Sequence, residues 1–392
     1  MKTLIFKYYK NIKFLSLYLL YCIDLNIYIS IIILRIRIII KKYELDFTMK
    51  YISKIFITLI FLFTVFGCNS LFESFKADAN EINLYSARKE HLIKPLTDSF
   101  TESTGIKVNI ITAKAAQLHQ RIVREGDSSK ADVLLTVDAG NLWKASNDNL
   151  LQEINSNFLN SRIKSKYKDP NNKWFGLSLR ARIIVYSTDR VKKNELIGYK
   201  YLANPIFKNR ILIRSSSNIY NQSLIAHMIS KYGINEAEKW AAGMVNNFAR
   251  NPAGGDRDQI KAVAAGEGDI AVVNSYYIAK MLNSDNKDLF NSLSIYFPSD
   301  DDMGTHLNIS GAALLKNAPN AENAIKFIEF LVSDKAQSIY SNSNFEYPVV
   351  ENIEISDILQ SFGIYTEDNI LTSEYGKLGA EAIKIADRVG WK

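Results

Sequence analysis

Hydrophobic and polar positions alternate with two different periods along residues 81–138. Glu81–Ser86 alternates polar and apolar residues, as a half-buried strand does. The segment after it places apolar residues at helical spacing before a stop near Gly105, namely Leu92, Ile93, Leu96 and Phe100. Strand-like segments at 107–111 and 131–138 enclose a second helical pattern. Strands that alternate with helices in this way predict right-handed β-α-β units and a parallel sheet.

The same alternation continues after a break at Asp169–Asn172. A long apolar run from Trp174 to Tyr186 is interrupted by Arg180 and Arg182, and it could cross from one domain into another. Further elements are predicted from the remaining patterns: strands at 211–214, 270–273, 293–297, 311–315 and 346–350, and helices that include 259–265 and 321–333. The whole pattern is typical of an α/β fold.

One stretch, Gly254–Tyr277, combines a loop, a short helix, a Gly-Glu-Gly-Asp turn and the apolar run Ile270–Val273. Such a short run between turn residues suits a buried strand of a parallel sheet. Tyr276 and Tyr277 would then follow the carboxyl end of the strand, where open α/β sheets bind ligands. Two adjacent phenols are candidate ligands for a hard, highly charged cation. Simple packing is the alternative, because the chain contains 21 tyrosines.

Charge is distributed unevenly along the chain. Residues 1–67 carry 10 Lys/Arg and 3 Asp/Glu, which accounts for the whole net charge of +7 of the 392 residues. The remainder is neutral, so nothing in the charge supports nucleic-acid binding.

Residues 1–67 are predicted to be a leader and signal peptide, with Met49 as the true start. Lys50–Lys54 forms a positive segment, and the apolar Ile55–Phe66 follows it. Cys68 then stands at the position of a cleavage site, although bulky Phe66 departs from the usual pattern. The arrangement resembles a bacterial lipoprotein signal, in which the cysteine is lipidated.

Residues 68–80 have no clear period and are expected to form a tether. A membrane span over Leu15–Ile40 is the alternative for the first part of the leader, but four residues there are costly at the bilayer centre: Asp24, Asn26, Arg35 and Arg37. The two cysteines, Cys22 and Cys68, both precede the body. The body therefore has no disulfide, thiolate metal site or cysteine nucleophile.

Seven short sequences occur in a fixed order between Glu81 and Lys392. They are Tyr85–Glu90, Ala131–Leu134, Trp174–Arg182, Arg214–Ser223, Gly254–Gln259, Asn274–Tyr277 and Glu346–Pro348. Together they resemble the iron(III)-binding periplasmic proteins of ABC transporters, which are type II substrate-binding proteins.

The resemblance implies two α/β lobes, each with a mixed, mostly parallel sheet flanked by helices, that close over the cargo by hinge motion. Lobe 1 would comprise residues 81–178 and about 307–356, and lobe 2 residues 179–306 and about 357–392. The resemblance also implies a periplasmic or extracytoplasmic monomer, lipid-anchored if Cys68 is modified. Its partners would be a ferric ion and the permease and ATPase subunits of an ABC transporter.

Three tyrosines, Tyr220, Tyr276 and Tyr277, match the iron-binding tyrosines of the family. Iron(III) is a hard ion that prefers charged oxygen donors. A phenol has a pKa of about 10 in isolation, but a bound cation can deprotonate its ligand. Three phenolates would balance the charge of the ferric ion.

Many family members place His or Tyr directly after the position of Arg88, whereas this chain has Lys89 and Glu90. The departure resembles the subgroup that uses three tyrosines and a bound anion, usually carbonate. Arg88 is the candidate for holding that anion, because a guanidinium suits a planar oxyanion. An ion pair is the alternative role for Arg88. Further possible site residues are Asp138, Glu90 and Tyr85.

Two other functions are the alternatives. A small oxyanion such as a phosphonate could bind to Arg88 and to Ser215–Ser217 at a helix start. An extracytoplasmic hydrolase would need a nucleophile and a base, and no such spacing is found. The histidines, His91, His119, His227 and His306, also lack metal-ligand spacing. A binding protein is therefore expected rather than an enzyme.

Overall fold

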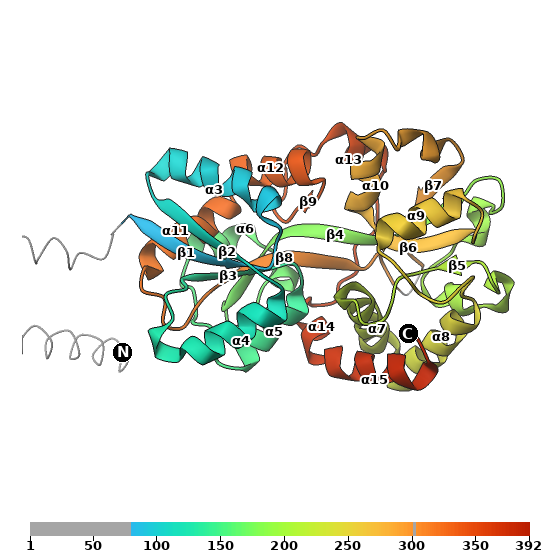
Figure 1. Ribbon diagram of the computed structural model, residues 1–392, viewed down its shortest axis with the longest axis horizontal. Coiled ribbons are helices and arrows are strands. Elements are labelled where there is room, and N and C mark those ends of the chain that lie inside the picture. The colour runs from blue at the N-terminus through green and yellow to red at the C-terminus, as the bar shows by residue number, and fades with distance from the viewer. Residues whose placement is uncertain (1–79, 301–302) are drawn as a thin grey trace, which may run out of the picture. The chain divides into compact units, whose positions relative to one another are not determined.

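A computed structural model describes residues 80–300 and 303–392 (Figure 1). The predicted leader, the start at Met49, Cys68 and nearly all of the tether lie outside these residues. The strands are β1 (Glu81–Ser86), β2 (Lys107–Thr112), β3 (Val133–Thr136), β4 (Trp174–Ser187), β5 (Ile211–Leu212), β6 (Ile270–Asn274), β7 (Leu293–Tyr296), β8 (Leu307–Leu314) and β9 (Tyr347–Pro348).

The helices alternate with these strands and cover them. They are α3 (Glu90–Thr104), α4 (Ala115–Glu125), α5 (Ala139–Asn147), α6 (Asn157–Arg162), α7 (Ile219–Tyr232), α8 (Ile234–Asn246), α9 (Asp256–Ala264), α10 (Ser275–Leu282), α11 (Ala321–Leu331), α12 (Asp334–Asn344), α13 (Asp357–Ser361), α14 (Ser373–Lys377) and α15 (Gly379–Val389). None of the helices in the described ranges combines the length and apolar composition of a membrane span.

The strands form one mixed sheet in the order β2-β1-β3-β8-β4-β6-β5, and β7 and β9 also pair with β4. β1 runs parallel to β2 and β3, and β5 runs parallel to β6. β4 and β8 run antiparallel to the strands they pair with. The α/β class is confirmed. The parallel pairs are confined to the two ends of the sheet, because the long strands β4 and β8 lie between them and run antiparallel to their neighbours.

Strand β4 connects these two ends of the sheet. Its first part, Trp174–Ala181, pairs with β8, and its second part, Arg182–Tyr186, pairs with β6. All 14 of its residues are buried. Arg180 can lie inside such a strand because its guanidinium donates to the carbonyl oxygens of Val137 and Ile309. The long apolar run of the sequence is therefore one continuous strand.

Most predicted elements are present, with local differences at their ends. Helix α3 ends at Gly105, whose φ of 71° is favourable for glycine and whose N–H donates to the Thr101 carbonyl oxygen. β3 stops at Thr136, before the predicted end, because Asp138 caps helix α5. β8 begins at Leu307, four residues before the predicted start, and it includes the buried polar residues Asn308 and Ser310.

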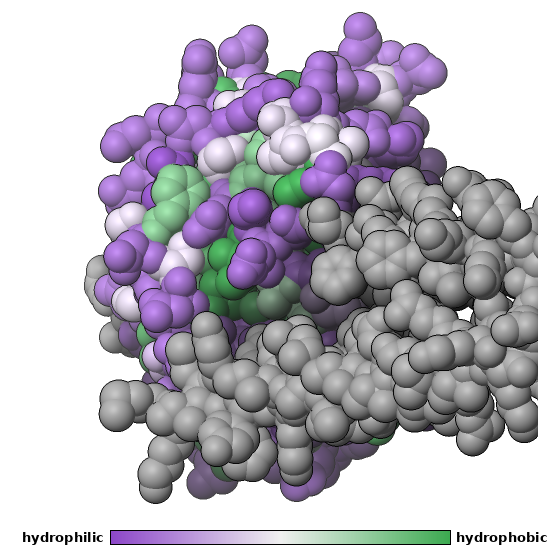
Figure 2. All heavy atoms as spheres, turned by 90° about the vertical axis from the view of Figure 1, so that its left-hand side faces the viewer, coloured by the Kyte–Doolittle hydropathy of each residue, from purple (hydrophilic) through white to green (hydrophobic). Residues whose placement is uncertain are grey.

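The apolar core lies on both sides of the sheet. Phe100 of α3 packs edge-on against Phe327 of α11, with ring centroids 5.0 Å apart. At the other end, Trp391 is buried against Trp240 and Phe248. In Figure 2, the uncovered part of the end carrying β1, β2 and α11 is mostly hydrophilic, with a small group of hydrophobic residues among the polar ones. The continuous core fixes the positions of the first turns of α7 and α10.

Candidate metal centre

Three predicted ligands come from the first turns of two helices. Tyr220 lies in α7, where the N-cap Asn218 accepts a hydrogen bond from the Tyr220 N–H at 3.0 Å. Tyr276 and Tyr277 lie in α10, directly after β6. Because β5 and β6 are adjacent and parallel, α7 and α10 follow the same edge of the sheet.

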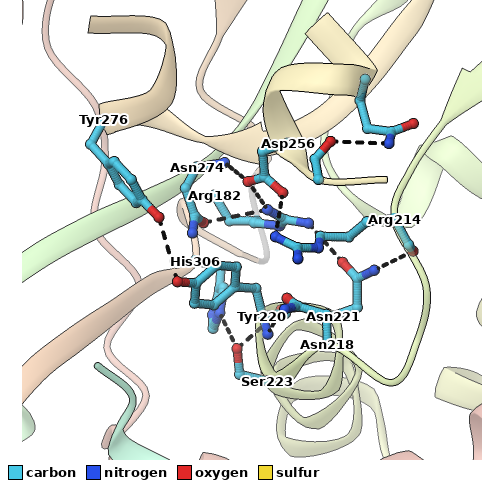
Figure 3. A network of polar contacts seen from close by, with 12 residues as sticks. Arg182, Arg214, Asn218, Tyr220, Asn221, Ser223, Asp256, Asn274, Tyr276 and His306 are labelled. Carbon is cyan, nitrogen blue, oxygen red and sulfur yellow. Dashed lines mark hydrogen bonds and ion pairs between the residues drawn. The ribbon is translucent and has the colours of Figure 1, made fainter. Parts of the chain in front are cut away.

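The three phenols line one cavity of about 320 Å³. The Tyr220 and Tyr276 hydroxyl oxygens are 3.4 Å apart (Figure 3). The rings of Tyr276 and Tyr277 lie with their centroids 4.2 Å apart. The structure therefore brings Tyr220 together with the adjacent pair Tyr276 and Tyr277, which follow it by more than 50 positions in the sequence.

Positive side chains dominate the remaining wall of the cavity. The lining includes five lysines and arginines, Arg88, Lys89, Arg180, Arg257 and Lys280, with His91 and a single carboxylate, Glu346. Such a wall attracts negative charge, whether a phenolate or a bound anion.

Cations also lie against the tyrosine rings themselves. The guanidinium carbons of Arg180, Arg182 and Arg214 are 5.5, 6.0 and 5.6 Å from the centroid of the Tyr220 ring. The Arg257 guanidinium carbon is 5.5 Å from the Tyr277 ring, and the Lys280 ammonium is 5.6 Å from the Tyr276 ring. Every phenol of the trio thus has a positive charge next to its ring.

Burial raises the pKa of Tyr276 well above its usual value, and the neighbouring phenols Tyr220 and Tyr277 add to the increase. Burial also raises the pKa of Tyr277. Both hydroxyls are therefore protonated at neutral pH. A bound metal ion would have to displace these protons, as it does from other ligands that coordinate in the deprotonated form.

Arg88 lines the cavity but is already paired. It is buried, its Nη2 lies 2.5 Å from Glu346 Oε1, and its Nη1 donates to Ser310 Oγ at 2.8 Å. Burial opposes ionisation of Glu346, but the charges of Arg88 and Arg180 outweigh it and hold the pKa of Glu346 below its usual value. Glu346 also accepts from Ser178 Oγ at 2.5 Å. Glu346 belongs to one of the seven sequences that carry the family resemblance, and no role was predicted for it.

The other possible site residues do not line this cavity. Asp138 is the N-cap of α5, accepting from Gly140 N–H, and it also accepts from Asn308 Nδ2. Glu90 is exposed in the first turn of α3. Tyr85 lies on β1, and its hydroxyl hydrogen-bonds Glu125 at 2.9 Å. Nor does the cavity include Ser215–Ser217, the helix-start cluster of the oxyanion alternative.

Two buried histidines form a pair that was not predicted from the sequence. His227 Nδ1 and His306 Nδ1 are 2.7 Å apart, although 79 residues separate them. His306 Nε2 is 3.2 Å from Ser223 Oγ, one turn along α7 from Tyr220. Within residues 80–300 and 303–392, no group of three or more His, Cys, Asp or Glu side chains is placed to hold a metal ion.

The profile of the bacterial extracellular solute-binding protein family matches residues 128–371, more than half of the chain. This protein belongs to that family. Iron uptake protein A1 of Synechocystis sp. is 43% identical to this solute-binding protein over 318 residues, covering 80% of this chain and 88% of that protein.

Solved structures agree with this assignment. A Trichodesmium protein described as "(IdiA) (FutA) in complex with iron and citrate ligands" has a TM-score of 0.77 and 50% identity, covering 80% of this chain and 100% of that chain. A ferric binding protein from Campylobacter jejuni has a TM-score of 0.75 and 41% identity, covering 79% of this chain and 100% of that one. The predicted family and fold class of this solute-binding protein are confirmed.

Proposed function

We propose that this solute-binding protein captures ferric iron with Tyr220, Tyr276 and Tyr277. The proposal depends on one observation: all three phenols line the same cavity of about 320 Å³. Relatives of high coverage named for iron uptake and ferric binding support the same cargo. They favour it over a phosphonate.

Charge balance explains why three phenols suit this ion. Three phenolates carry three negative charges, which match the ferric ion and are the hard oxygen donors it prefers. The cations beside the rings of Tyr220, Tyr276 and Tyr277 favour the deprotonated form of each ligand. Burial works against that form at Tyr276 and Tyr277, so these two phenols stay neutral until iron arrives.

A co-bound oxyanion, in the simplest case carbonate, would complete the coordination of the ion. Arg88, Lys89, Arg257 and Lys280 supply the positive charge for it. Two Arg88 nitrogens already donate to Glu346 and Ser310, but the described residues supply no acceptor for its buried Nε. A carbonate oxygen could fill that position. Lys89 and Arg257 are exposed and would contact an anion from the solvent side.

Delivery would proceed to the permease and ATPase of an ABC transporter. In this proposal, residues 81–178 with about 307–356 form one lobe, and residues 179–306 with about 357–392 form the other. The lobes close over iron around β4 and β8, and the protein acts by binding, without a chemical reaction. A signal peptide that ends at Cys68 would place the protein outside the cytoplasmic membrane on a lipid anchor.

Release would follow protonation of the anion or of a phenolate, or reduction to iron(II). Each change weakens the match between the charge of the ligands and the charge of the metal. The alternative cargo is a small oxyanion alone, which the positive wall of the cavity would also attract. It requires no metal and no phenolate.

Visible absorption of the purified protein tests the proposal. Adding iron(III) and bicarbonate should produce a phenolate-to-iron charge-transfer band, and Tyr276→Phe or Tyr220→Phe should weaken or shift it. Tyr296→Phe is a matched control, because the Tyr296 hydroxyl donates to the Ile197 carbonyl oxygen and does not line the cavity. A colourless protein that binds a phosphonate equally well with and without iron would overturn the ferric assignment.

A further inference from the structure

We propose that Asp256 is a positioning residue for the three tyrosines. Its carboxylate holds Arg182 and Arg214 beside the Tyr220 ring and fixes the backbone that leads into Tyr276 and Tyr277. The inference rests on the proposed ferric function, and it assigns a role to the Gly254–Gln259 stretch, for which the sequence analysis found none.

The Asp256 side chain is completely buried at the start of α9 and has three partners. Its Oδ2 accepts from Arg182 Nη1 at 2.8 Å and from the Asn274 backbone N–H at 2.8 Å. Its Oδ1 accepts from Arg214 Nη1 at 3.1 Å. Figure 3 shows the Asp256 carboxylate above Tyr220, with the guanidiniums of Arg182 and Arg214 beneath it. One carboxylate therefore joins three chain segments around the proposed metal ligands.

The contacts close into a ring through the neighbour of Tyr220. Arg182 Nη2 donates to Asn221 Oδ1 at 2.7 Å, and Asn221 Nδ2 donates to the Arg214 carbonyl oxygen at 2.7 Å. Arg214 returns to Asp256 through its side chain. Because each member has two partners in the ring, the first turn of α7 cannot move without breaking a buried, charge-assisted hydrogen bond.

The same carboxylate anchors the second helix of the trio. Asn274 is the last residue of β6 and the N-cap position of α10, so the bond to its N–H fixes the peptide just before Tyr276. Asp256 thus fixes the position of Tyr220 relative to the Tyr276–Tyr277 pair. Groups that orient metal ligands in this way typically change metal affinity by about 10- to 100-fold when removed.

Charge is the second part of the role. The Arg182 side chain is almost fully buried, and a buried guanidinium is costly without a partner. Asp256 allows two guanidiniums to remain 6.0 and 5.6 Å from the Tyr220 ring, where they place positive charge beside the proposed ligand. Removing the carboxylate leaves both cations without their shared counter-charge, so no ion pair fixes their positions beside the ring.

The decisive variant is Asp256→Asn, measured by its charge-transfer band and by iron affinity in competition with citrate. The expected result is a shifted or weaker band and an affinity lower by about 10- to 100-fold. Asp269→Asn is the matched control: Asp269 also bridges two arginines, Arg190 at 2.8 Å and Arg210 at 2.7 Å, but it does not line the cavity. It should lower the melting temperature and leave the band and the affinity unchanged.

The outcomes separate the two proposals. If the wild-type protein remains colourless, the ferric function itself fails. If the wild type is coloured and Asp256→Asn keeps the wild-type band and affinity, the positioning role is overturned. Should Asp256→Asn not fold, Arg214→Lys decides, since an ammonium cannot match the planar, multiple contacts of a guanidinium. A shifted band in Arg214→Lys supports the role of Asp256, and a wild-type band overturns it.

Discussion

Arg88 Nη2 lies 2.5 Å from Glu346 Oε1, and both side chains are buried. The pair joins the end of β1 to the segment before β9, across 258 positions of sequence. An ion pair removed from water is costly to break from one side, because the remaining charge has no partner and little solvent. Arg88 therefore has a structural contact in addition to the anion-binding role proposed for it.

Glu346→Gln should destabilise the protein by about 3–5 kcal/mol, because it leaves the Arg88 charge buried without its counter-charge. Urea unfolding followed by tryptophan fluorescence measures the difference. Glu351→Gln is the control, since Glu351 pairs with Lys164 at 3.0 Å but is 68% exposed. An exposed pair of this kind contributes about 0–1 kcal/mol. Equal losses of unfolding free energy in Glu346→Gln and Glu351→Gln would contradict a larger contribution from the buried pair.

Iron binding should release protons from the tyrosines. Because the pKa values of Tyr276 and Tyr277 are raised, both hydroxyls are protonated at pH 7 in the free protein and must lose their protons to coordinate. Titration with one ferric chelate in a pH-stat should show about one proton fewer for Tyr276→Phe or Tyr277→Phe than for the wild type. Affinity should rise with pH for the same reason. Equal proton release in the wild type and both variants would exclude coordination by these phenolates.

Stability should decrease on mild acidification because of the His227–His306 pair. Burial lowers the pKa of His227, and it lowers the pKa of His306 well below its usual value, with His227, Arg182 and Arg180 adding to the second effect. Asp368 Oδ2, 3.4 Å from His227 Nε2, opposes the effect on His227.

In the unfolded chain, His227 and His306 each bind a proton near pH 6.5, whereas in the folded chain they stay neutral to lower pH. The stabilisation that comes from this pair is therefore fully present above pH 6.5 and is lost as pH falls towards the lowered pKa values. The slope is at most about 1.4 kcal/mol per pH unit for each histidine. Unfolding free energies measured between pH 7.5 and 5 should show the decline, and His227→Gln should reduce it. A flat profile would contradict the buried, neutral pair.

Lys280→Gln should weaken the anion contribution to iron binding. Lys280 lines the cavity, and its pKa is lowered chiefly by burial, so the ammonium is poorly solvated and available to an anion. The variant should need more bicarbonate to reach half-maximal colour, and the difference should shrink at high salt. Exposed Lys287, in the same part of the chain, provides the control Lys287→Gln. A bicarbonate dependence identical in both variants would remove Lys280 from the anion site.

The places of the three tyrosines at helix starts could be predicted because their signals are local, and their grouping as ligands was implied by the resemblance to iron(III)-binding periplasmic proteins. Tyr276 and Tyr277 follow a short apolar strand, and Tyr220 follows a Ser-Asn cluster that begins a helix. Each pattern lies within a few residues, and the order of the strands brings the patterns together. The same holds for Gly105, which ends α3 as expected.

The partners of these residues could not be predicted, because nothing local specifies them. Glu346 approaches Arg88, and His306 approaches His227, only after distant segments of the sheet have paired. The direction of β4 and β8 could not be predicted for a similar reason: a continuous apolar run indicates burial but not whether its neighbours run parallel. Asp256 precedes the helix predicted at 259–265, and only the fold surrounds it with two guanidiniums.

All three tyrosines belong to helices that follow the adjacent strands β5 and β6, so they form one unit. An ion held by them would stay with that unit when the opposite wall withdraws. Mechanical opening by a transporter would then uncover the cargo without detaching it, and the handover would need a chemical trigger, either protons or an electron. Such a carrier would keep its ion when it opens by chance and would release it only where protons or an electron are supplied.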